Sequence, residues 1–489
     1  MKSFKRISRT IPITKALTFL FILNLIGSTS YAQNPFEGIW IGNMEINEKT
    51  KMKVAFEVSL GDNQELRAVM HSVDQEAYDL PIDNITVEGS NIRLQVSPLN
   101  AVFNGLLAEN GILEGHMTQG KNAPWVLNME MTENLPRPKP KRTQEPDLPY
   151  PYQVEELTFP NDGAGVTLAG TLTIPQSPGP HPAIILISGS GPNDRDATIF
   201  GHKYFLVLAD QLTRSGYAVL RVDDRGTAES SGDFDSASIV ELADDVVAGI
   251  EYLKSRSEIN KNQIGLIGHS LGAVIAPIAA DQSDDVAYIV MMAGVAVPLY
   301  QGIYEQTEAY YSKMVRPEAV QLNTEILETV FEVIRDEEDN GKALEIIGAK
   351  LERFNTSVAE LTAEEQKFLN MSMPLLSGKY KFFMTPAMRV DLFYDQKASI
   401  QKVTCPVLAL NGSLDLQVLP KNLEDIENAL KEGGNKNFTV KLFEGKNHLF
   451  QCAKAGTPDE YGKIEETISP DVLEFLISWL DQLTIGLRN

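Results

Sequence analysis

Residues 264–276 read IGLIGHSLGAVIA, and this stretch decides the fold. An apolar run enters the motif GHSLG, residues 268–272, and a run of small and apolar residues leaves it. The first run is typical of a buried strand and the second of a helix, so Ser270 lies where one becomes the other. The flanking glycines either serve a tight turn only or clear space around a nucleophilic serine. A nucleophile also needs a histidine, an acid and an oxyanion site elsewhere in the chain.

The general base and the acid that orients it are expected C-terminal to Ser270 in the sequence. His448, in the segment FEGKNHLF, is the one histidine beyond Ser270, and it follows a predicted strand that ends at Phe443. The segment VLALNGSLDLQV places Asp415 just after the preceding predicted strand, whereas Asp425 falls within the next predicted helix and fits less well. The order serine, aspartate, histidine is that of the α/β-hydrolases. We therefore predict a triad of Ser270, Asp415 and His448.

An oxyanion site needs backbone N–H groups aimed at the reacting carbonyl. One donor is expected from Leu271, at the start of the helix that follows Ser270. The other is expected from the turn SGSGPNDRD, which follows the apolar run AIILI. Ser190 is the first choice in that turn and Gly191 the second. The alternative is that these glycines only shape the turn.

Strand and helix patterns alternate from about residue 153, which predicts a doubly wound, mostly parallel α/β sheet. The sheet occupies residues 153–298 and 399–489. Predicted strands span 154–159, 168–174, 183–187, 218–222, 264–267, 288–293, 407–410 and 439–443, and predicted helices span 204–214, 239–253 and 271–280.

Residues 299–398 interrupt that alternation. Their apolar positions recur at helical spacing and no run reads as a strand, so we predict a helical cap inserted between two strands of the sheet. Six side chains of the cap either line a substrate pocket or pack between its helices: Tyr304, Tyr310, Tyr311, Phe382, Phe383 and Met384.

The N-terminal third is organised differently. Residues 33–132 show short strand patterns at 52–60, 66–73, 92–96 and 126–131, separated by turn residues, which predicts a small all-β accessory domain. Residues 133–152 contain six prolines and four basic residues and predict an extended linker. Within residues 1–32, basic residues, the apolar run 16–26 and the small residues of Ser30-Tyr31-Ala32 follow one another. This order predicts a secretory signal peptide cleaved before Gln33, and hence a periplasmic or extracellular protein.

A membrane anchor is the alternative for that apolar run, but spanning a bilayer takes about 20 apolar residues. The run 16–26 is too short, and we predict no stable anchor. Removing residues 1–32 takes away five basic and no acidic residues, which changes the net charge from −23 to −28. So acidic a protein repels nucleic acid and anionic lipid, and neither is expected as a partner. The six histidines show no metal-ligand spacing.

Two cysteines, Cys405 and Cys452, allow one disulfide in an exported protein. Cys405 is expected at the start of a strand and Cys452 beyond the opposite end of the sheet. The two ends are farther apart than the ~7 Å between Cα atoms that a disulfide tolerates. We predict two separate thiols.

Five segments occur in a fixed order: SGSGPNDRD, LRVDDRG, GHSLG, NGSLDLQV and KNH. Through them residues 153–485 resemble the α/β-hydrolase superfamily, and in particular the secreted serine carboxylesterases of the EstD-like kind, often described as serine aminopeptidase-like hydrolases. The resemblance implies cleavage of carboxylic esters of small or medium acyl groups, without a cofactor or metal, by the triad named above. Ala228 and Ala273 stand where the family commonly has glycine, which puts the local backbone shape in question. Five charged residues of these segments are expected to form ion pairs that hold the active-site loops, without a catalytic step: Asp194, Arg195, Asp223, Asp224 and Arg225.

Two other functions remain open from the sequence. A peptidase or amidase would use the same triad on a different leaving group. A non-catalytic carbohydrate-binding or partner-binding protein would carry a decayed hydrolase fold, although all three triad residue types are present. The expected substrate is a small-molecule ester, with acylated sugars among the candidates.

Overall fold

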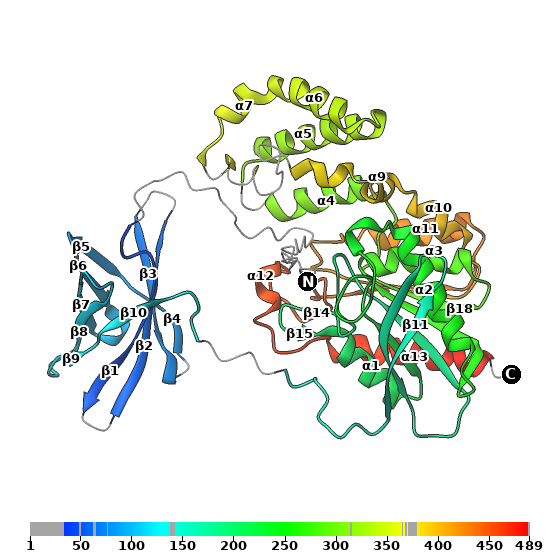
Figure 1. Ribbon diagram of the computed structural model, residues 1–489, viewed down its shortest axis with the longest axis horizontal. Coiled ribbons are helices and arrows are strands. Elements are labelled where there is room, and N and C mark those ends of the chain that lie inside the picture. Colours follow the sequence, from blue (N-terminus) through cyan, green and yellow to red (C-terminus); the bar gives the residue numbers. More distant parts are fainter. Residues whose placement is uncertain are drawn as a thin grey trace, which may run out of the picture. The chain divides into compact units, whose positions relative to one another are not determined.

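The computed structural model describes residues 34–487 except 48–49, 62–64, 76, 137–141, 313–314, 364, 367–368 and 370–378. The predicted signal peptide, residues 1–32, lies outside this range. The chain forms two compact units that divide between Lys139 and Pro140 (Figure 1). Each unit has its own buried core.

The N-terminal unit is all β, as predicted. Its strands form one antiparallel sheet in the order β4-β3-β2-β1-β10-β8-β7-β6-β5, with β9 paired to β1 and β8. Trp40, Phe56 and Phe103 are among the fully buried side chains of its core. The strands are β1 (Gly38–Asn47), β2 (Thr50–Leu60), β3 (Leu66–Ser72), β4 (Ala77–Pro81), β5 (Asn84–Glu88), β6 (Asn91–Val96), β7 (Ala101–Leu107), β8 (Leu113–Gln119), β9 (Trp125–Val126) and β10 (Met129–Thr132).

The second unit contains an eight-stranded sheet in the order β11-β12-β16-β13-β17-β18-β19-β20. The strand β12 pairs antiparallel with β11 and β16, and the remaining neighbours pair parallel. The strands are β11 (Gln153–Asn161), β12 (Val166–Ile174), β13 (His181–Ile187), β16 (Ala218–Val222), β17 (Ile259–His269), β18 (Val286–Met292), β19 (Val407–Gly412) and β20 (Phe438–Phe443), beside a short hairpin of β14 (Thr198–Ile199) and β15 (His202–Lys203).

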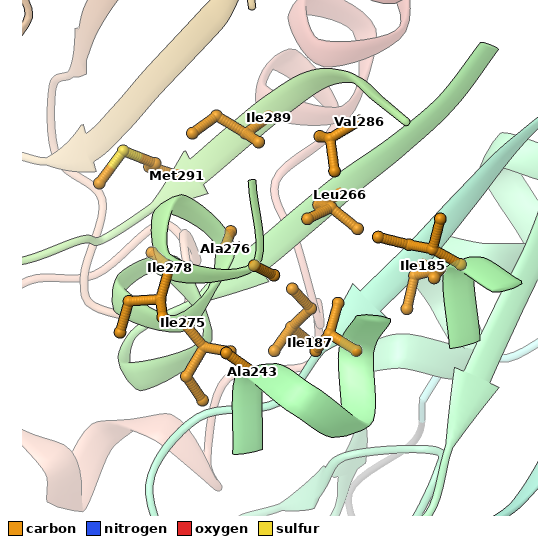
Figure 2. Close-up of a cluster of buried hydrophobic side chains, with 14 of the residues drawn as sticks. Ile185, Ile187, Ala243, Leu266, Ile275, Ala276, Ile278, Val286, Ile289 and Met291 are labelled. Atoms are coloured by element: carbon orange, nitrogen blue, oxygen red, sulfur yellow. The ribbon is translucent and has the colours of Figure 1, made fainter. Parts of the chain in front are cut away.

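Helices cover both faces of this sheet because its central strands are apolar on both sides. In β13, Ile185 and Ile187 pack on one face and Ile184 and Leu186 on the other. The first face carries α2 (Ile239–Lys254), α3 (Leu271–Gln282) and α11 (Asn422–Glu432), and the second carries α1 (Tyr204–Arg214) and α13 (Pro470–Leu487). Figure 2 shows the first core, where strand residues such as Ile185 meet side chains of α2 and α3.

A helical insertion separates β18 from β19, where the sequence predicted one. It comprises α4 (Leu299–Tyr311), α5 (Pro317–Asp336), α6 (Asn340–Leu351), α7 (Asn355–Ala359) and α9 (Pro386–Phe393). In it α4 packs on α5 and α9, and α9 also contacts α2 (Figure 1). The following helix, α10 (Gln396–Lys402), packs on α3 and α11 and thus belongs to the sheet layers. The aromatic side chains of the insertion pack on one another: Tyr304 stacks on Phe331, which meets Phe383 edge to face.

Part of the predicted linker packs on the second unit instead of running free. The Gln144 side chain bonds to the backbone of Thr467 and Ile468, and the Tyr152 hydroxyl donates to Asp210 at 2.9 Å. Within the described part of the chain, no helix is long and apolar enough to cross a membrane. The same residues contain no cluster of three His, Cys, Asp or Glu side chains placed to hold a metal ion.

Candidate active site

The turn from β17 into α3 places Ser270 at φ 56° and ψ −118°. The serine itself takes the positive φ, and neither flanking glycine does. The glycines are needed for space: a Cβ on Gly268 would lie 2.0 Å from the carbonyl oxygen of Gly272, and one on Gly272 would lie 2.1 Å from that of Ile187. The turn is therefore built to hold Ser270 in a strained conformation, as in a nucleophile elbow.

The predicted acid and base meet. The Nδ1 atom of His448 lies 2.8 Å from the Oδ2 atom of Asp415. The other oxygen, Oδ1, accepts the backbone N–H groups of Gln417 and Val418 at 2.8 and 2.9 Å. Because a carboxylate oxygen accepts hydrogen bonds, His448 Nδ1 is the donor in this pair. The poorer candidate, Asp425, lies within α11 as expected.

Ser270 and His448 line one pocket of about 140 Å³. Ser190 and Leu271, the expected oxyanion donors, line it too, whereas Gly191 is not among its lining residues. Asp415 lies behind the imidazole and is 1% exposed. The structure thus gathers Ser270, His448, Ser190 and Leu271 around one space, with Asp415 supporting the histidine from outside it.

Hydrogen bonds to the side chain of Asp224 fix the turn that follows β13. This half-buried carboxylate accepts the Ser188 hydroxyl at 2.7 Å and the Asn193 backbone N–H at 2.8 Å. The Asn193 side chain then donates to the carbonyl oxygens of Gly189 and Gly191 at 3.1 and 2.6 Å. Burial raises the pKa of Asp224 to about 7. The segment 188–193 is therefore fixed at both ends, as preorganised donors require.

The sequence suggested ion pairs among the acidic and basic residues beside these loops. Arg195 pairs with Asp223, with Nη2 2.6 Å from Oδ2, and Arg225 pairs with Asp245 through Nε, also at 2.6 Å. Asp224 differs, because the partners described for it are a hydroxyl and an amide. Its expected role in an ion pair was wrong, since the loop folds back onto it and satisfies both oxygens.

His269 supports the site through a contact to which sequence reasoning gave no role. Its Nε2 atom lies 2.9 Å from the carbonyl oxygen of His448, which can only accept, so His269 donates. Burial, and then the neighbouring His448, lower the pKa of His269 to about 3. The ring is neutral at physiological pH and ties the elbow to the loop that carries His448. The one sequence feature that could have pointed to His269 is its position within the GHSLG motif.

The two departures from the family pattern have local explanations. Ala228 has φ 45°, in the left-handed region where glycine is favoured, which accounts for the usual glycine. Ala273 is fully buried in the first turn of α3, where its methyl group fills space beside Gly294. Cys405 and Cys452 are both free thiols, as predicted.

Comparison with known proteins gives three relevant similarities. Residues 162–448 match the family described as X-Pro dipeptidyl-peptidase (S15 family). Esterase EstD of Thermotoga maritima is 29% identical over 338 residues, which cover 68% of this chain and 70% of that protein. The solved esterase Pf2001 of Pyrococcus furiosus superposes with a TM-score of 0.40 at 17% identity, over 67% of this chain and 92% of that one.

The family match covers more than half of the chain, from residue 162, just after β11, to His448, and so includes Ser270 and Asp415. The expected resemblance to EstD-like α/β-hydrolases is confirmed by this match together with the EstD similarity. The protein is a hydrolase, and the chain belongs to the X-Pro dipeptidyl-peptidase (S15) family of α/β-hydrolases.

Proposed function

We propose that the protein is a serine carboxylesterase that works through an acyl-enzyme on Ser270. The observation that carries the proposal is the 2.8 Å contact between His448 Nδ1 and buried Asp415, with His448 and Ser270 lining the same pocket. Asp415 orients the imidazole and stabilises the imidazolium that forms during the reaction. That arrangement supplies the base without which a serine hydroxyl is unreactive at neutral pH.

In the proposed reaction the Ser270 Oγ attacks the ester carbonyl while His448 Nε2 takes the hydroxyl proton. The N–H groups of Leu271 and Ser190 hold the oxyanion, and each such donor is worth about 3 kcal/mol in the transition state. His448 then gives its proton to the leaving alcohol. Water, activated by the same imidazole, attacks the acyl-enzyme and regenerates Ser270.

We propose small or medium acyl groups, and the size of the pocket supports this. Val274, Val295 and Ile303 are among the apolar side chains that line its volume of about 140 Å³. An engineered apolar cavity of about 150 Å³ in another protein binds benzene. We therefore propose acyl groups up to about the size of a butanoyl or benzoyl group, with acylated sugars among the natural esters.

The helical insertion is proposed to act as a cap. Leu299, Gly302 and Ile303 of α4 and Asp391 of α9 all contribute to the pocket lining, so the insertion forms part of its wall. We further propose that the chain is exported and cleaved before Gln33, which N-terminal sequencing of the mature protein tests. The all-β unit is proposed to be an accessory domain.

The direct test is hydrolysis of p-nitrophenyl butanoate by two serine variants. Ser270→Ala should lower kcat by about 10⁴- to 10⁶-fold. Ser190→Ala is the matched control, because its proposed contribution comes from the backbone N–H and survives the substitution. A Ser270→Ala variant with wild-type turnover would show the assignment to be wrong.

The S15 match favours one alternative, a peptidase with the same triad. Hydrolysis of an aminoacyl-proline p-nitroanilide should be compared with that of p-nitrophenyl butanoate. Faster cleavage of the anilide would favour the peptidase, whereas we expect the ester to react faster. A chain that turns over neither substrate and does not react with a fluorophosphonate would be a binding protein on a decayed fold.

A further inference from the structure

The proposed substrate pocket contains a carboxylate that the reaction does not use. Asp391, on α9 of the insertion, lines the pocket together with Ser270 and His448. Among the described lining residues Asp391 is the one carboxylate, and no lysine or arginine stands beside it. The acidic charge is therefore not neutralised from within the pocket.

The contacts of Asp391 leave much of its charge uncompensated. Its Oδ1 atom accepts a hydrogen bond from the backbone N–H of Ile239 at 2.9 Å. Among the described residues, no second hydrogen bond is made to this carboxylate. The side chain is 9% exposed. Burial, with Glu241 as a further cause, raises the pKa of Asp391 to about 6 against the lowering effect of that hydrogen bond. At neutral pH the group is mostly ionised in a site that penalises its charge.

The structural role of Asp391 uses one of its two oxygens. Ile239 begins α2, and an aspartate that accepts a backbone N–H at a helix N-terminus stabilises the helix. Ser238 and Glu241 form a capping box at the same end, which leaves the Ile239 N–H to Asp391. Within the part of the chain that the structure describes, no hydrogen bond reaches the second carboxylate oxygen.

We propose that Asp391 is a specificity subsite for a positively charged group, an ammonium, carried by the acyl or alcohol part of the substrate. This rests on the proposed function, because it names the substrate class of the same pocket. An ammonium beside a partly buried carboxylate gains an attraction that bulk water would screen, together with a charge-assisted hydrogen bond where it carries N–H groups. The net charge of −23 also raises the local concentration of cations around the protein.

The test compares a cation with a neutral molecule of similar size. Pentylammonium and pentan-1-ol are measured as competitive inhibitors of p-nitrophenyl butanoate hydrolysis. Butanoylcholine and 3,3-dimethylbutyl butanoate, which differ in charge and hardly in shape, are compared as substrates. For the wild-type protein we expect the cation to be favoured about tenfold or more in each pair, which corresponds to about 1.4 kcal/mol.

Asp391→Asn removes the charge but keeps an oxygen that accepts from Ile239, and it should abolish the preference for the cation. The readout is the ratio within each pair, so a general loss of activity cancels. Asp395→Asn is the matched control: Asp395 is exposed, caps α10 through the Ala398 N–H at 3.0 Å, and does not line the pocket. This variant should keep the wild-type ratio.

Two outcomes overturn the proposal: a wild-type ratio near one, or an Asp391→Asn variant that keeps the cation preference. Both ratios are measured on a protein that hydrolyses these esters. If the wild-type protein hydrolyses none of these esters, the proposed function fails instead. Calorimetric titration of the Ser270→Ala protein with pentylammonium then still decides whether Asp391 binds cations.

Discussion

Strain at Ser270 predicts that this position would be more stable as glycine than as alanine. The backbone there has φ 56° and ψ −118°, a conformation that costs a residue with a side chain about 1–3 kcal/mol. Alanine keeps this strain and glycine releases it. Glycine loses about 0.4–1 kcal/mol through the greater entropy of the unfolded chain. Ser270→Gly should therefore exceed Ser270→Ala in free energy of unfolding by about 1–2 kcal/mol.

The comparison is made by urea denaturation followed by circular dichroism at 222 nm, which reports the helix-rich second unit. Both variants lack the hydroxyl, so its contacts cancel. Ser255 provides the control pair, because it is exposed and ends α2 at φ −74° and ψ −14°. There glycine should be less stable than alanine by about 0.5–1 kcal/mol. The reasoning fails if Ser270→Gly is no more stable than Ser270→Ala while the Ser255 pair behaves as stated.

Three further predictions concern the elbow, the triad and the loop beneath the oxyanion site. Gly272→Ala should lower the free energy of unfolding by about 3 kcal/mol, because the new Cβ would lie 2.1 Å from a backbone oxygen. Gly348→Ala in α6 is the control: a Cβ there meets nothing within 4 Å, so this variant should raise the free energy of unfolding by about 0.5–1 kcal/mol. Equal denaturation midpoints for the two variants would contradict this prediction. Asp415→Asn should lower kcat for p-nitrophenyl butanoate by about 10⁴-fold, and a loss below tenfold would remove Asp415 from the triad. Burial raises the pKa of Asp224 to about 7, so between about pH 4 and 7 the folded protein keeps a proton that the unfolded chain releases. The contribution of Asp224 to stability therefore falls as pH rises through that window, and urea unfolding at pH 5 and 7.5 should show Asp224→Asn gaining on the wild-type protein at the higher pH.

The pattern of apolar residues was enough to locate the helices and strands that are buried over most of their length. The ranges 204–214 and 218–222 correspond residue for residue to α1 and β16, since most positions in both are apolar and buried. The strand β17 begins at Ile259, five residues before the predicted start, because the polar residues 260–263 separate buried Ile259 from the apolar run that begins at Ile264. The apolar pattern therefore located the continuous buried part of the strand and missed its start.

The all-β unit shows the same effect more strongly. Five of its strands, β1, β4, β5, β7 and β8, were not predicted individually. The strand β5 is exposed at four of its five positions, so hydrogen bonding to β6 rather than burial keeps it in the sheet. The predicted strand 126–131 is split into β9 and β10 by Leu127 and Asn128, which lie outside both ladders.

The positions of Ser270, Asp415 and His448 could be predicted because each follows a recognisable strand of a parallel sheet, whose carboxyl ends meet at one edge. The residues around them could not. His269 donates to a carbonyl 179 positions away, and Asp391 bonds to a backbone N–H 152 positions away. Such contacts arise from the packing of distant segments and leave no periodic trace in the sequence.

The central claim is that Asp415 and His448 make the hydroxyl of Ser270 reactive. The most direct measurement is the site of covalent labelling by a fluorophosphonate, read by peptide mass spectrometry on the wild-type protein and on His448→Gln. We predict one adduct, on Ser270, that forms rapidly in the wild-type protein and at least a hundredfold more slowly in the variant. Labelling at another residue, or equal rates in the two proteins, would contradict the account.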